Sequence, residues 1–334
     1  MNSEFIDLKG KRILLFSAQL FGYQLEIMKC MNRLGAVVDY YDERPGNSFW
    51  IKALLRINRN LLGLYTDKYY NHIIKQTRNI AYSYVFFTKG ESISVSNLRK
   101  LKAFHPQAQF IIYHWDSIAN NRNAQNLMPF FDKVFSFDKI DCEKNGIRFL
   151  PLFYIPDYVK IAKSKETMLY DLLFVGTAHS DRYELIKNIE CQFERNGKKC
   201  YSFFFFPSKI LFYKMKFQNP VFRSLSERMF HFKSMSKENL LYLFSVSRVI
   251  VDIQHPKQTG LTMRTIETLG AKRKMITTNQ AVEEYDFYNP NNILIINRKD
   301  PVIPEEFLNS AYQEIPQETY NKYSIEQWLT TILS

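Results

Sequence analysis

Residues 249–279, VIVDIQHPKQTGLTMRTIETLGAKRKMITTN, show the clearest structural pattern in the chain. A β-branched apolar run at 249–253 leads into a polar loop that ends at Gly260. A stretch of helical character follows, and a second apolar run covers 275–278. This order predicts a strand, a loop, a helix and another strand, with polar side chains collected at the carboxyl ends of the strands.

Ligands of open α/β sheets bind in the crevice at the carboxyl ends of the strands. A helix that begins at Gly260 would direct the N–H groups of Gly260, Leu261 and Thr262 toward a phosphate in this crevice; an ordinary helix start is the alternative. Glu267 would lie about two turns inside the helix, too deep to cap it. A carboxylate there can accept hydrogen bonds from two adjacent hydroxyls, such as those of a ribose.

The chain has 334 residues, 46% of them hydrophobic, which is enough material for two cores. It contains no run of 18 apolar residues and no signal-peptide pattern at its N-terminus, so we expect a cytoplasmic protein without a transmembrane helix. The four cysteines are scattered, and no Cys or His pair has the spacing of zinc ligands. We therefore expect reduced thiols and no bound metal.

Short apolar segments alternate with helical segments along the whole chain, which predicts parallel βαβ units in two α/β domains. The predicted strands are 12–17, 36–41, 81–88, 109–115, 133–137, 171–176, 199–206, 249–253, 275–278 and 293–296. Helices are predicted at 22–34, 94–104, 181–196, 236–245 and 316–333. Two prolines and a polar stretch weaken the pattern between 150 and 170, where we place the inter-domain linker.

Two Rossmann-like domains in tandem form the GT-B architecture of many glycosyltransferases. The stretches DLLFVGTAHSDRYELI (171–186) and VDIQHPKQTGLTMRTIETLGAKRKMITTN (251–279), with IIYHWDSI (111–118) in the first half, resemble bacterial CgeB-like glycosyltransferases of capsule and lipopolysaccharide gene clusters. The resemblance implies two parallel sheets that face a central cleft. It implies an acceptor-side domain at 1–155, a donor-binding domain at 156–315 and a helical segment at 316–334 that crosses back to the first domain.

The resemblance also implies transfer of a sugar from a nucleotide-activated donor to a growing surface polysaccharide or lipid-linked glycan, at the cytoplasmic face of the membrane. Glu267 matches the glutamate that holds the donor ribose in GT-B enzymes; an exposed helix carboxylate is the alternative. Gly176 and Thr177 end the first strand of the second domain, where the family places a loop that faces the donor. Thr278 and Asn279 end a later strand and would contact the base or the sugar.

Four further side chains are candidates for contacts with the donor. Arg182 follows the first loop of the second domain and would meet a phosphate; a solvated helix residue is the alternative. Arg264 lies three residues before the ribose-site glutamate, so it pairs with that carboxylate or reaches a phosphate. Lys257 and Gln258 lie on the loop beside the crevice and would contact a phosphate or the sugar.

Inverting transfer requires a general base near the acceptor hydroxyl. Asp116 directly follows the buried strand at 109–115 and is the first candidate, with a capping role in a turn or helix as the alternative. His114 lies two residues earlier on the same strand face and is the second candidate. Gly22, after the first strand, would line the cleft in a GT-B fold.

Two departures from better-known patterns bear on the chemistry. Retaining GT-B enzymes often carry a glutamate eight residues before the ribose glutamate, and Thr259 stands at that position, so the stereochemistry stays open. The chain has no D-x-D motif, which GT-A enzymes use to hold a metal. This favours metal-independent transfer, with helix N-termini and basic side chains offsetting the charge of the leaving group. The motifs of P-loop ATPases, common NAD enzymes, α/β-hydrolases and zinc proteases are also absent.

The net charge of +12 is concentrated in two segments that are also rich in large apolar residues. Residues 50–78 hold six Lys or Arg and one Asp, and residues 198–233 hold eight Lys or Arg and one Glu. The mixture suits the surface of an anionic membrane. Single-stranded nucleic acid would fit the same mixture, but no nucleic-acid motif is present. A core strand followed by an amphipathic helix with a solvated basic face is the structural alternative.

Two other functions stay open from the sequence. One is a nucleotide-sugar epimerase with the GT-B fold, and the other is a non-catalytic protein that retains the fold and binds a glycan or a membrane. The two basic, aromatic segments favour the transferase over the epimerase, because a soluble substrate requires no membrane contact. The sequence does not distinguish the donor base, the sugar or the acceptor.

Overall fold

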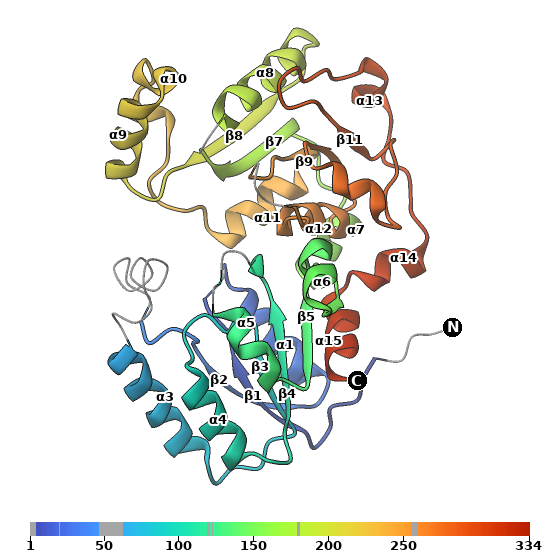
Figure 1. Ribbon diagram of the computed structural model, residues 1–334. Helices are drawn as coiled ribbons and strands as arrows, with labels where there is room; N and C mark the ends of the chain where they lie inside the picture. Colours follow the sequence, from blue (N-terminus) through green and yellow to red (C-terminus); the bar gives the residue numbers. More distant parts are fainter. Residues whose placement is uncertain are drawn as a thin grey trace. The chain divides into compact units, whose positions relative to one another are not determined.

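The structure is a computed structural model of the 334-residue chain and describes residues 5–19, 21–46, 63–118, 121, 123–178, 181–255 and 259–334. The chain divides into two compact units (Figure 1). Unit 1 comprises Met1–Leu152 and Ile325–Ser334, and unit 2 comprises Phe153–Ser324. No helix in the described ranges is both long and apolar enough to cross a membrane.

Unit 1 is built on a six-stranded parallel sheet with the strand order β2-β1-β3-β4-β5-β6. Its strands are β1 (Arg12–Phe16), β2 (Val37–Tyr41), β3 (Tyr84–Phe87), β4 (Gln109–His114), β5 (Lys133–Ser136) and β6 (Arg148–Phe149). Its helices are α1 (Tyr23–Arg33), α3 (Gly63–Thr77), α4 (Val95–Phe104), α5 (Ala124–Leu127), η3 (Met128–Phe130), α6 (Lys139–Asn145) and α15 (Ile325–Leu333). The central strands are continuous apolar runs because helices cover both faces of the sheet.

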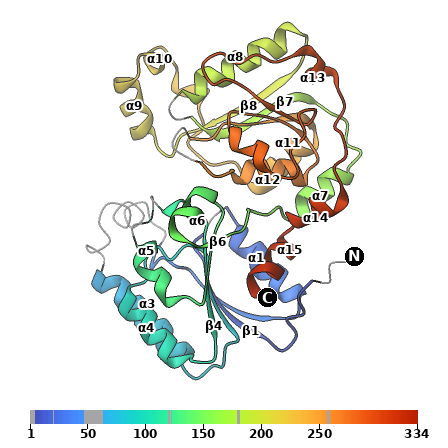
Figure 2. The ribbon, with the colours of Figure 1, turned by 45° about the vertical axis from the view of Figure 1, so that its right-hand side comes forward.

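The two faces of this sheet are covered by different helices (Figure 2). On one face, alternate strand residues such as Phe87 and Ile112 form a core with Ile73 of α3. On the other face, Tyr113 packs against Trp328 of α15, with ring centroids 4.9 Å apart. The last helix of the chain therefore belongs to unit 1, because it completes the apolar cover of this second face.

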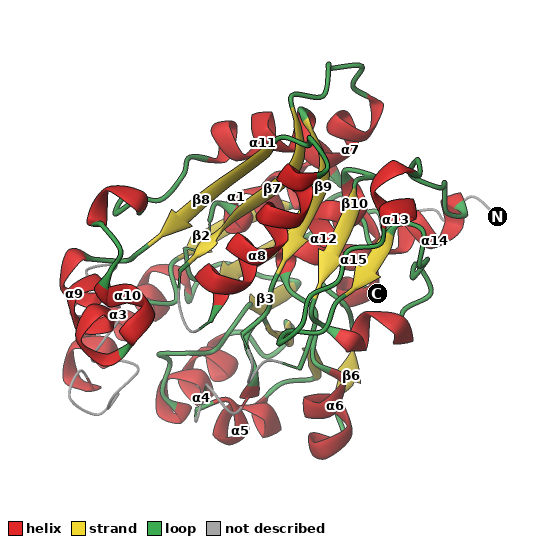
Figure 3. Cartoon of the chain, turned by 90° about the horizontal axis from the view of Figure 1, so that it is seen from above, coloured by secondary structure: helices red, strands yellow, loops and turns green. Residues whose placement is uncertain are grey.

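Unit 2 is built on a five-stranded parallel sheet with the strand order β11-β10-β9-β7-β8 (Figure 3). Its strands are β7 (Tyr170–Thr177), β8 (Cys200–Phe205), β9 (Ser247–Asp252), β10 (Lys274–Thr277) and β11 (Ile293–Ile295). Its helices are α7 (Pro156–Lys163), α8 (Arg182–Arg195), α9 (Lys209–Gln218), α10 (Pro220–Arg223), η4 (Glu227–Met229), α11 (Lys237–Ser245), α12 (Met263–Gly270), η5 (Gln280–Glu284), α13 (Glu305–Asn309) and α14 (Gln317–Lys322).

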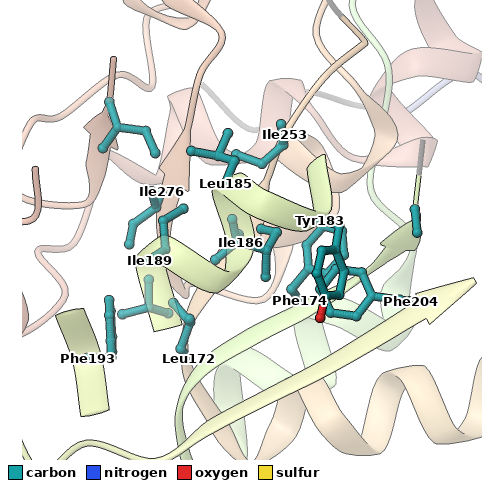
Figure 4. Close-up of a cluster of buried hydrophobic side chains, with 14 of the residues drawn as sticks. Leu172, Phe174, Tyr183, Leu185, Ile186, Ile189, Phe193, Phe204, Ile253 and Ile276 are labelled. Carbon is teal, nitrogen blue, oxygen red and sulfur yellow. The ribbon is translucent and has the colours of Figure 1, made fainter. Parts of the chain in front are cut away.

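Helix α8 covers one face of the unit 2 sheet, and α7, α11 and α12 lie on the other (Figure 1). Ile186 and Ile189 of α8 project onto Leu172 and Phe174 of β7, with Phe204 of β8 beside them (Figure 4). On the opposite face, α12 approaches Tyr154 so closely that a Cβ at Gly270 would lie 2.6 Å from that ring's Cβ and Cγ. The chain thus needs glycine at this position.

Three predicted elements differ from the structure. Helix α12 begins at Met263 and not at Gly260, because Thr262 serves as its N-cap and accepts a hydrogen bond from Thr265 N–H. The predicted linker contains α7, since Pro156 stands in the first helical turn, where a proline is tolerated. The predicted tail helix is divided into α14 and α15 at Tyr323, whose carbonyl accepts a hydrogen bond from Tyr154 N–H.

Strand order fixes where a ligand can reach each sheet. In unit 2, the connection after β7 leads to β8 on one side, and the chain then continues with β9 on the other side. The switch point therefore lies between the carboxyl ends of β7 and β9. In unit 1 the corresponding switch lies between β1 and β3.

Candidate functional site

A buried carboxylate marks the switch point of unit 2. Asp252, the last residue of β9, accepts hydrogen bonds from the hydroxyls of Thr262 (2.7 Å) and Thr265 (2.6 Å). Burial raises the pKa of Asp252, and these two hydroxyl hydrogen bonds oppose the shift. Because Thr262 also caps α12, the carboxylate ties the end of β9 to the start of the helix.

Arg182, the first residue of α8, links the ends of β7 and β9. Its guanidinium donates to the carbonyl of Thr177 (3.1 Å) and to the carbonyl of Ile253. Burial lowers the pKa of Arg182 to about 10, and the charge of Asp252 opposes that shift. Its Nε is buried without a partner among the described residues. Arg182 is therefore not a solvated helix residue, and its guanidinium connects the carboxyl ends of β7 and β9 at the switch point.

Arg264 and Glu267 form an ion pair on α12, with 2.6 Å between Nη1 and Oε2. Both side chains are largely buried, and Arg264 also donates to the carbonyl of Val175 in β7 (3.4 Å). Its guanidinium lies 5.1 Å from the centre of the Phe244 ring. Of the two roles that the spacing left open for Arg264, the structure shows the pairing with the carboxylate. This pairing fixes the position of the buried Glu267.

The polar residues after β10 brace the loop that precedes α12. The Asn279 amide donates to the carbonyl of Gly260 (3.3 Å), and its oxygen accepts a hydrogen bond from Ala281 N–H (3.1 Å). The Thr278 hydroxyl donates to Gln254 (3.0 Å), on the loop that follows β9. Leu261 is buried in the core. These contacts hold the loop ends together at the carboxyl edge of the sheet.

Arg298 is a site residue that the sequence pattern did not single out. It forms a two-pronged ion pair with Asp181, at 2.7 and 2.9 Å, and donates to the carbonyl of Gln254 (3.1 Å). Asp181 precedes α8 and makes no capping hydrogen bond to that helix. Arg298 follows β11 by three residues. Polar residues just beyond the carboxyl ends of the other predicted strands were taken as candidates. The same criterion applied to the strand at 293–296 would have identified Arg298.

The structure thus gathers most of the predicted donor-site residues at one edge of the unit 2 sheet. This group comprises Gly176, Thr177, Arg182, Gly260, Leu261, Thr262, Arg264, Glu267, Thr278 and Asn279. Lys257 and Gln258 lie outside the described residues. Within the described residues, no three His, Cys, Asp or Glu side chains form a group that could hold a metal ion.

In unit 1, Asp116 lies two residues beyond the end of β4. Its carboxylate is 3.2 Å from the Lys89 ammonium, and 42% of the side chain is exposed. Its other oxygen accepts a hydrogen bond from Ser117 N–H (3.0 Å). Lys89 also lies 3.7 Å from Glu91. Asp116 is therefore both accessible and oriented by a neighbouring cation.

A second buried carboxylate, Glu43, organises the loop that carries Lys89. Its two oxygens accept hydrogen bonds from the backbone N–H groups of Thr88 (3.0 Å), Lys89 (2.7 Å) and Glu91 (3.0 Å). Burial raises the pKa of Glu43 to about 7, and the hydrogen bonds from Glu91 and Lys89 oppose the shift. The sequence analysis missed Glu43, although its place just after β2 was a usable signal.

His114 is the last residue of β4 and is buried. Burial lowers the pKa of His114 to about 4, so the imidazole is neutral at pH 7. Among the described residues, its Nε2 has no hydrogen-bond partner. The two base candidates therefore differ in access, since Asp116 is exposed and His114 is not. Gly22 is in the left-handed conformation, with φ 86°, at the start of α1.

No protein-family model and no curated protein matches the sequence. The chain is similar to the UDP-GlcNAc 2-epimerase of Methanocaldococcus jannaschii, in complex with UDP-GlcNAc and UDP, with 12% identity, a TM-score of 0.54 and coverage of 96% of this chain and 98% of that one.

Two further solved structures are similar over almost the whole chain. One is an α,α-trehalose 6-phosphate synthase from Burkholderia multivorans, with 11% identity, a TM-score of 0.58 and coverage of 97% and 95% of the two chains. The other is a glycosyltransferase from Rickettsia africae, with 13% identity, a TM-score of 0.52 and coverage of 97% and 93%. With the two parallel-sheet units, these likenesses show that the chain has the predicted GT-B fold. At these identities they show the fold alone.

The buried state of His114 gives a testable pH dependence of stability. Because the folded pKa is about 4 and the usual value is near 6.5, the unfolded chain binds more protons between these values. The free energy of unfolding should therefore fall as the pH drops from 6.5 to 4, by up to about 1.4 kcal/mol per pH unit from this group. Urea unfolding of wild type and His114→Phe over this range should show a shallower slope for the variant. Equal slopes would contradict the buried neutral imidazole, and the exposed His72→Gln supplies the control.

Proposed function

We propose that the protein is a glycosyltransferase that takes its sugar from a nucleotide-activated donor bound by unit 2. The observation that carries this proposal is the Arg264–Glu267 pair. It presents a buried, positioned carboxylate on the helix that begins at the switch point of a GT-B fold. Glu267 would accept hydrogen bonds from the two hydroxyls of the donor ribose. Thr177, Thr278 and Asn279 would lie beside the base or the sugar.

The charge of the leaving nucleotide diphosphate would be offset mainly by backbone N–H groups. The three arginines at this edge, Arg182, Arg264 and Arg298, are already engaged with carbonyls or carboxylates. Helix α8 has no side-chain cap, because Asp181 binds Arg298, and a 14-residue helix concentrates positive potential at such an end. We therefore propose transfer that does not require a metal.

We propose Asp116 as the general base that removes the proton of the acceptor hydroxyl. Its carboxylate is exposed and is oriented by Lys89, whereas His114 is buried and so is less accessible to an acceptor hydroxyl. Lys89 is in turn positioned by Glu43, which binds the backbone on both sides of Gly90. An aspartate base favours inversion at the anomeric carbon.

Nucleotide binding tests the donor site. The melting temperature should rise with one of UDP, GDP, TDP and CMP, because a ligand that binds only the folded state adds about 2.7 kcal/mol at a hundredfold excess over Kd. The shift should be lost in Glu267→Ala and retained in Glu305→Ala, which removes an exposed carboxylate. If none of the four nucleotides raises the melting temperature of a well-folded wild-type sample, the result would contradict the donor site and favour a non-catalytic binding protein.

Release of the nucleotide tests the base. The assay uses a nucleotide sugar that contains the nucleotide found in the melting experiment, and membranes supply the acceptor. In this assay Asp116→Asn should lower the rate of nucleotide release by about 100-fold or more. Its donor affinity should match that of the wild type, because the substitution lies outside unit 2. Glu143→Gln, an exposed carboxylate on α6, is the matched control. Unchanged release by Asp116→Asn would exclude Asp116 as the base.

The likeness to the UDP-GlcNAc 2-epimerase keeps an epimerase as the second candidate. An epimerase would convert the bound nucleotide sugar to its 2-epimer without any acceptor. A transferase would leave the sugar configuration at C2 unchanged and would release nucleotide only when an acceptor or water takes the sugar. Proton NMR of the donor after incubation with the protein alone separates the two activities.

We further propose that the acceptor is a membrane-bound glycan of the capsule or lipopolysaccharide type and that α9 contacts the anionic membrane surface. Most aromatic residues of the basic segment 198–233 belong to the core, so only part of it remains available. Helix α9 is this part: Ile210 and Phe217 are 81% and 84% exposed, and Tyr213 lies between them on the same face. Basic residues such as Lys214 flank this face.

In the other basic segment, residues 50–62 lie outside the described residues, and α3 covers 63–77. Leu64 at the start of α3 is 91% exposed, next to the half-exposed Tyr65. This apolar end of α3 would be the second membrane contact. The net charge of α3 is only +1, whereas that of α9 is +3, so we base the test on α9.

Co-sedimentation with vesicles that contain phosphatidylserine tests the membrane contact. Binding should fall as the salt concentration rises, because the lysines act through screened electrostatics. The double variant Ile210→Asp/Phe217→Asp should lose most of the binding at low salt. Val302→Asp, which places a charge on an exposed apolar residue elsewhere in unit 2, should keep it. Equal binding by both variants would exclude α9 as the contact.

A further inference from the structure

A polar pocket lies at the opposite end of the unit 2 sheet from the candidate donor site. It has a volume of about 310 Å³ and is formed by the amino ends of β7, β9 and β10 together with the segment after α13. Five cationic side chains and one carboxylate line it, and they are Lys198, Arg248, Lys272, Arg273, Lys274 and Asp171. The lining therefore carries an excess of four positive charges.

The carboxylates near this pocket neutralise only two of these cations. Arg248 lies 3.5 Å from Asp171, and Lys272 pairs with Glu314. Lys198 reaches only the neutral side chain of Asn309, at 3.5 Å. Three cations of the lining thus have no carboxylate partner among the residues that the structure describes.

Lys274 is the most unusual of the three because it is buried at the start of β10. Its ammonium donates to the carbonyls of Phe307 and Ser310 and to the Ser310 hydroxyl, and it lies 3.9 Å from the centre of the Phe307 ring. All of these partners are neutral. Burial lowers the pKa of Lys274 to about 8. A buried cation is normally paired with an anion, and here no described residue supplies one.

Arg273 repeats this arrangement on the other side of the strand. Its guanidinium donates to the carbonyls of Phe244 (3.2 Å) and Ser245 (3.1 Å) at the end of α11. The end of a helix carries a partial negative charge, which accounts for part of the preference for a cation there. It does not balance the excess of three positive charges that remains once Asp171 and Glu314 are counted.

We propose that this pocket binds a soluble phosphorylated small molecule. A phosphate monoester or pyrophosphate carries the two or more negative charges that the lining lacks, whereas a single carboxylate would leave most of the excess. At the pocket rim Arg248 is exposed and Lys198 is partly exposed, and both would contact the phosphate directly, with Arg248 as a bidentate donor. Lys274 and Arg273 would act through their charge, since carbonyl and hydroxyl oxygens already occupy their N–H groups. The volume lies at the small end of ligand sites.

This pocket is separate from the donor site of the same unit. The donor-site residues follow the carboxyl ends of β9 and β10, and the pocket lies at their amino ends, roughly 15 Å away by the rise along a strand. Helix α12 connects the two places. Thr262 caps its first turn at the donor site, and Lys272 to Lys274 follow its last turn at the pocket. The proposal does not depend on the donor being a nucleotide sugar.

Binding of pyrophosphate to the full chain tests the proposal, with potassium chloride at matched ionic strength as the reference. Pyrophosphate should raise the melting temperature in a saturable manner. Its Kd by isothermal titration calorimetry should increase at least about tenfold in Lys198→Ala/Arg248→Ala, because two charge-assisted contacts are lost. Both side chains are at the surface, so circular dichroism should show a folded variant. Lys160→Ala/Lys187→Ala removes the same charge from exposed helix positions of unit 2 and should bind as the wild type does.

Three outcomes would overturn the proposal. If pyrophosphate has no effect beyond that of the matched salt, the cations serve only to stabilise helix ends. If both double variants bind pyrophosphate as tightly as the wild type, the anion binds elsewhere, such as at the donor site. A lipid headgroup is a different source of the same phosphate chemistry. Loss of vesicle binding by Lys198→Ala/Arg248→Ala, with no response to pyrophosphate, would assign the pocket to the membrane and contradict a soluble ligand.

Discussion

The hydrogen bonds of Asp252 are the interaction on which the candidate donor site depends. A carboxylate at the end of a buried strand is costly unless its oxygens are hydrogen-bonded, and Thr262 and Thr265 supply these bonds from α12. Those two hydroxyls can reach Asp252 only when the helix begins beside β9. The helix start in turn sets the depth of Glu267, about one and a half turns beyond the cap, and the side of the helix on which it lies.

Unit 1 also contains a buried carboxylate near a strand end, and a different kind of hydrogen-bond donor stabilises it. Glu43 is also a buried carboxylate just beyond a strand end, but it binds three backbone N–H groups of a neighbouring loop instead of hydroxyls. Backbone donors cannot change with the sequence, so this arrangement fixes the course of the loop itself. The loop sets the position of Lys89, and Lys89 in turn orients the Asp116 carboxylate through their ion pair. In each unit a buried acid thus orders the chain near a second carboxylate, Glu267 in unit 2 and Asp116 in unit 1.

The sequence predicted the two α/β domains because parallel strands buried on both faces leave continuous apolar runs, as in the strands β1, β4 and β7. It also placed most of the described site residues at the carboxyl edge of unit 2, because strand ends determine that edge, but it missed Arg298. It could not predict how these residues use their hydrogen bonds. Arg182 and Asn279 were expected to face the donor, and the structure shows that their polar groups largely bind carbonyls.

The helix boundaries that sequence analysis misplaced have one cause. A cap and a break depend on a tertiary partner that the local pattern does not contain. Thr262 is one of several threonines in 259–268, and only the distant Asp252 makes it the cap. Tyr323 has no local signal of a break, and the tail is divided there because Tyr154, far away in the chain, binds its carbonyl.

The net charge of the chain likewise does not reveal the environment of each cation. The excess of +12 suggested two basic surfaces, yet the cations of unit 2 occupy three different environments. Arg182, Arg264 and Arg298 are fixed by carbonyls and carboxylates around the donor site, so they contribute little free charge there. Lys274 is buried and Arg273 is half-buried, and neither has a carboxylate partner in the part of the chain that the structure describes. The charge of a buried cation acts through a low dielectric and is screened little, whereas the charges of the exposed α9 lysines are screened by water and salt. These cations count equally in the composition, but we expect them to select different ligands. Arg273 and Lys274 should select their ligand more specifically than the exposed lysines of α9.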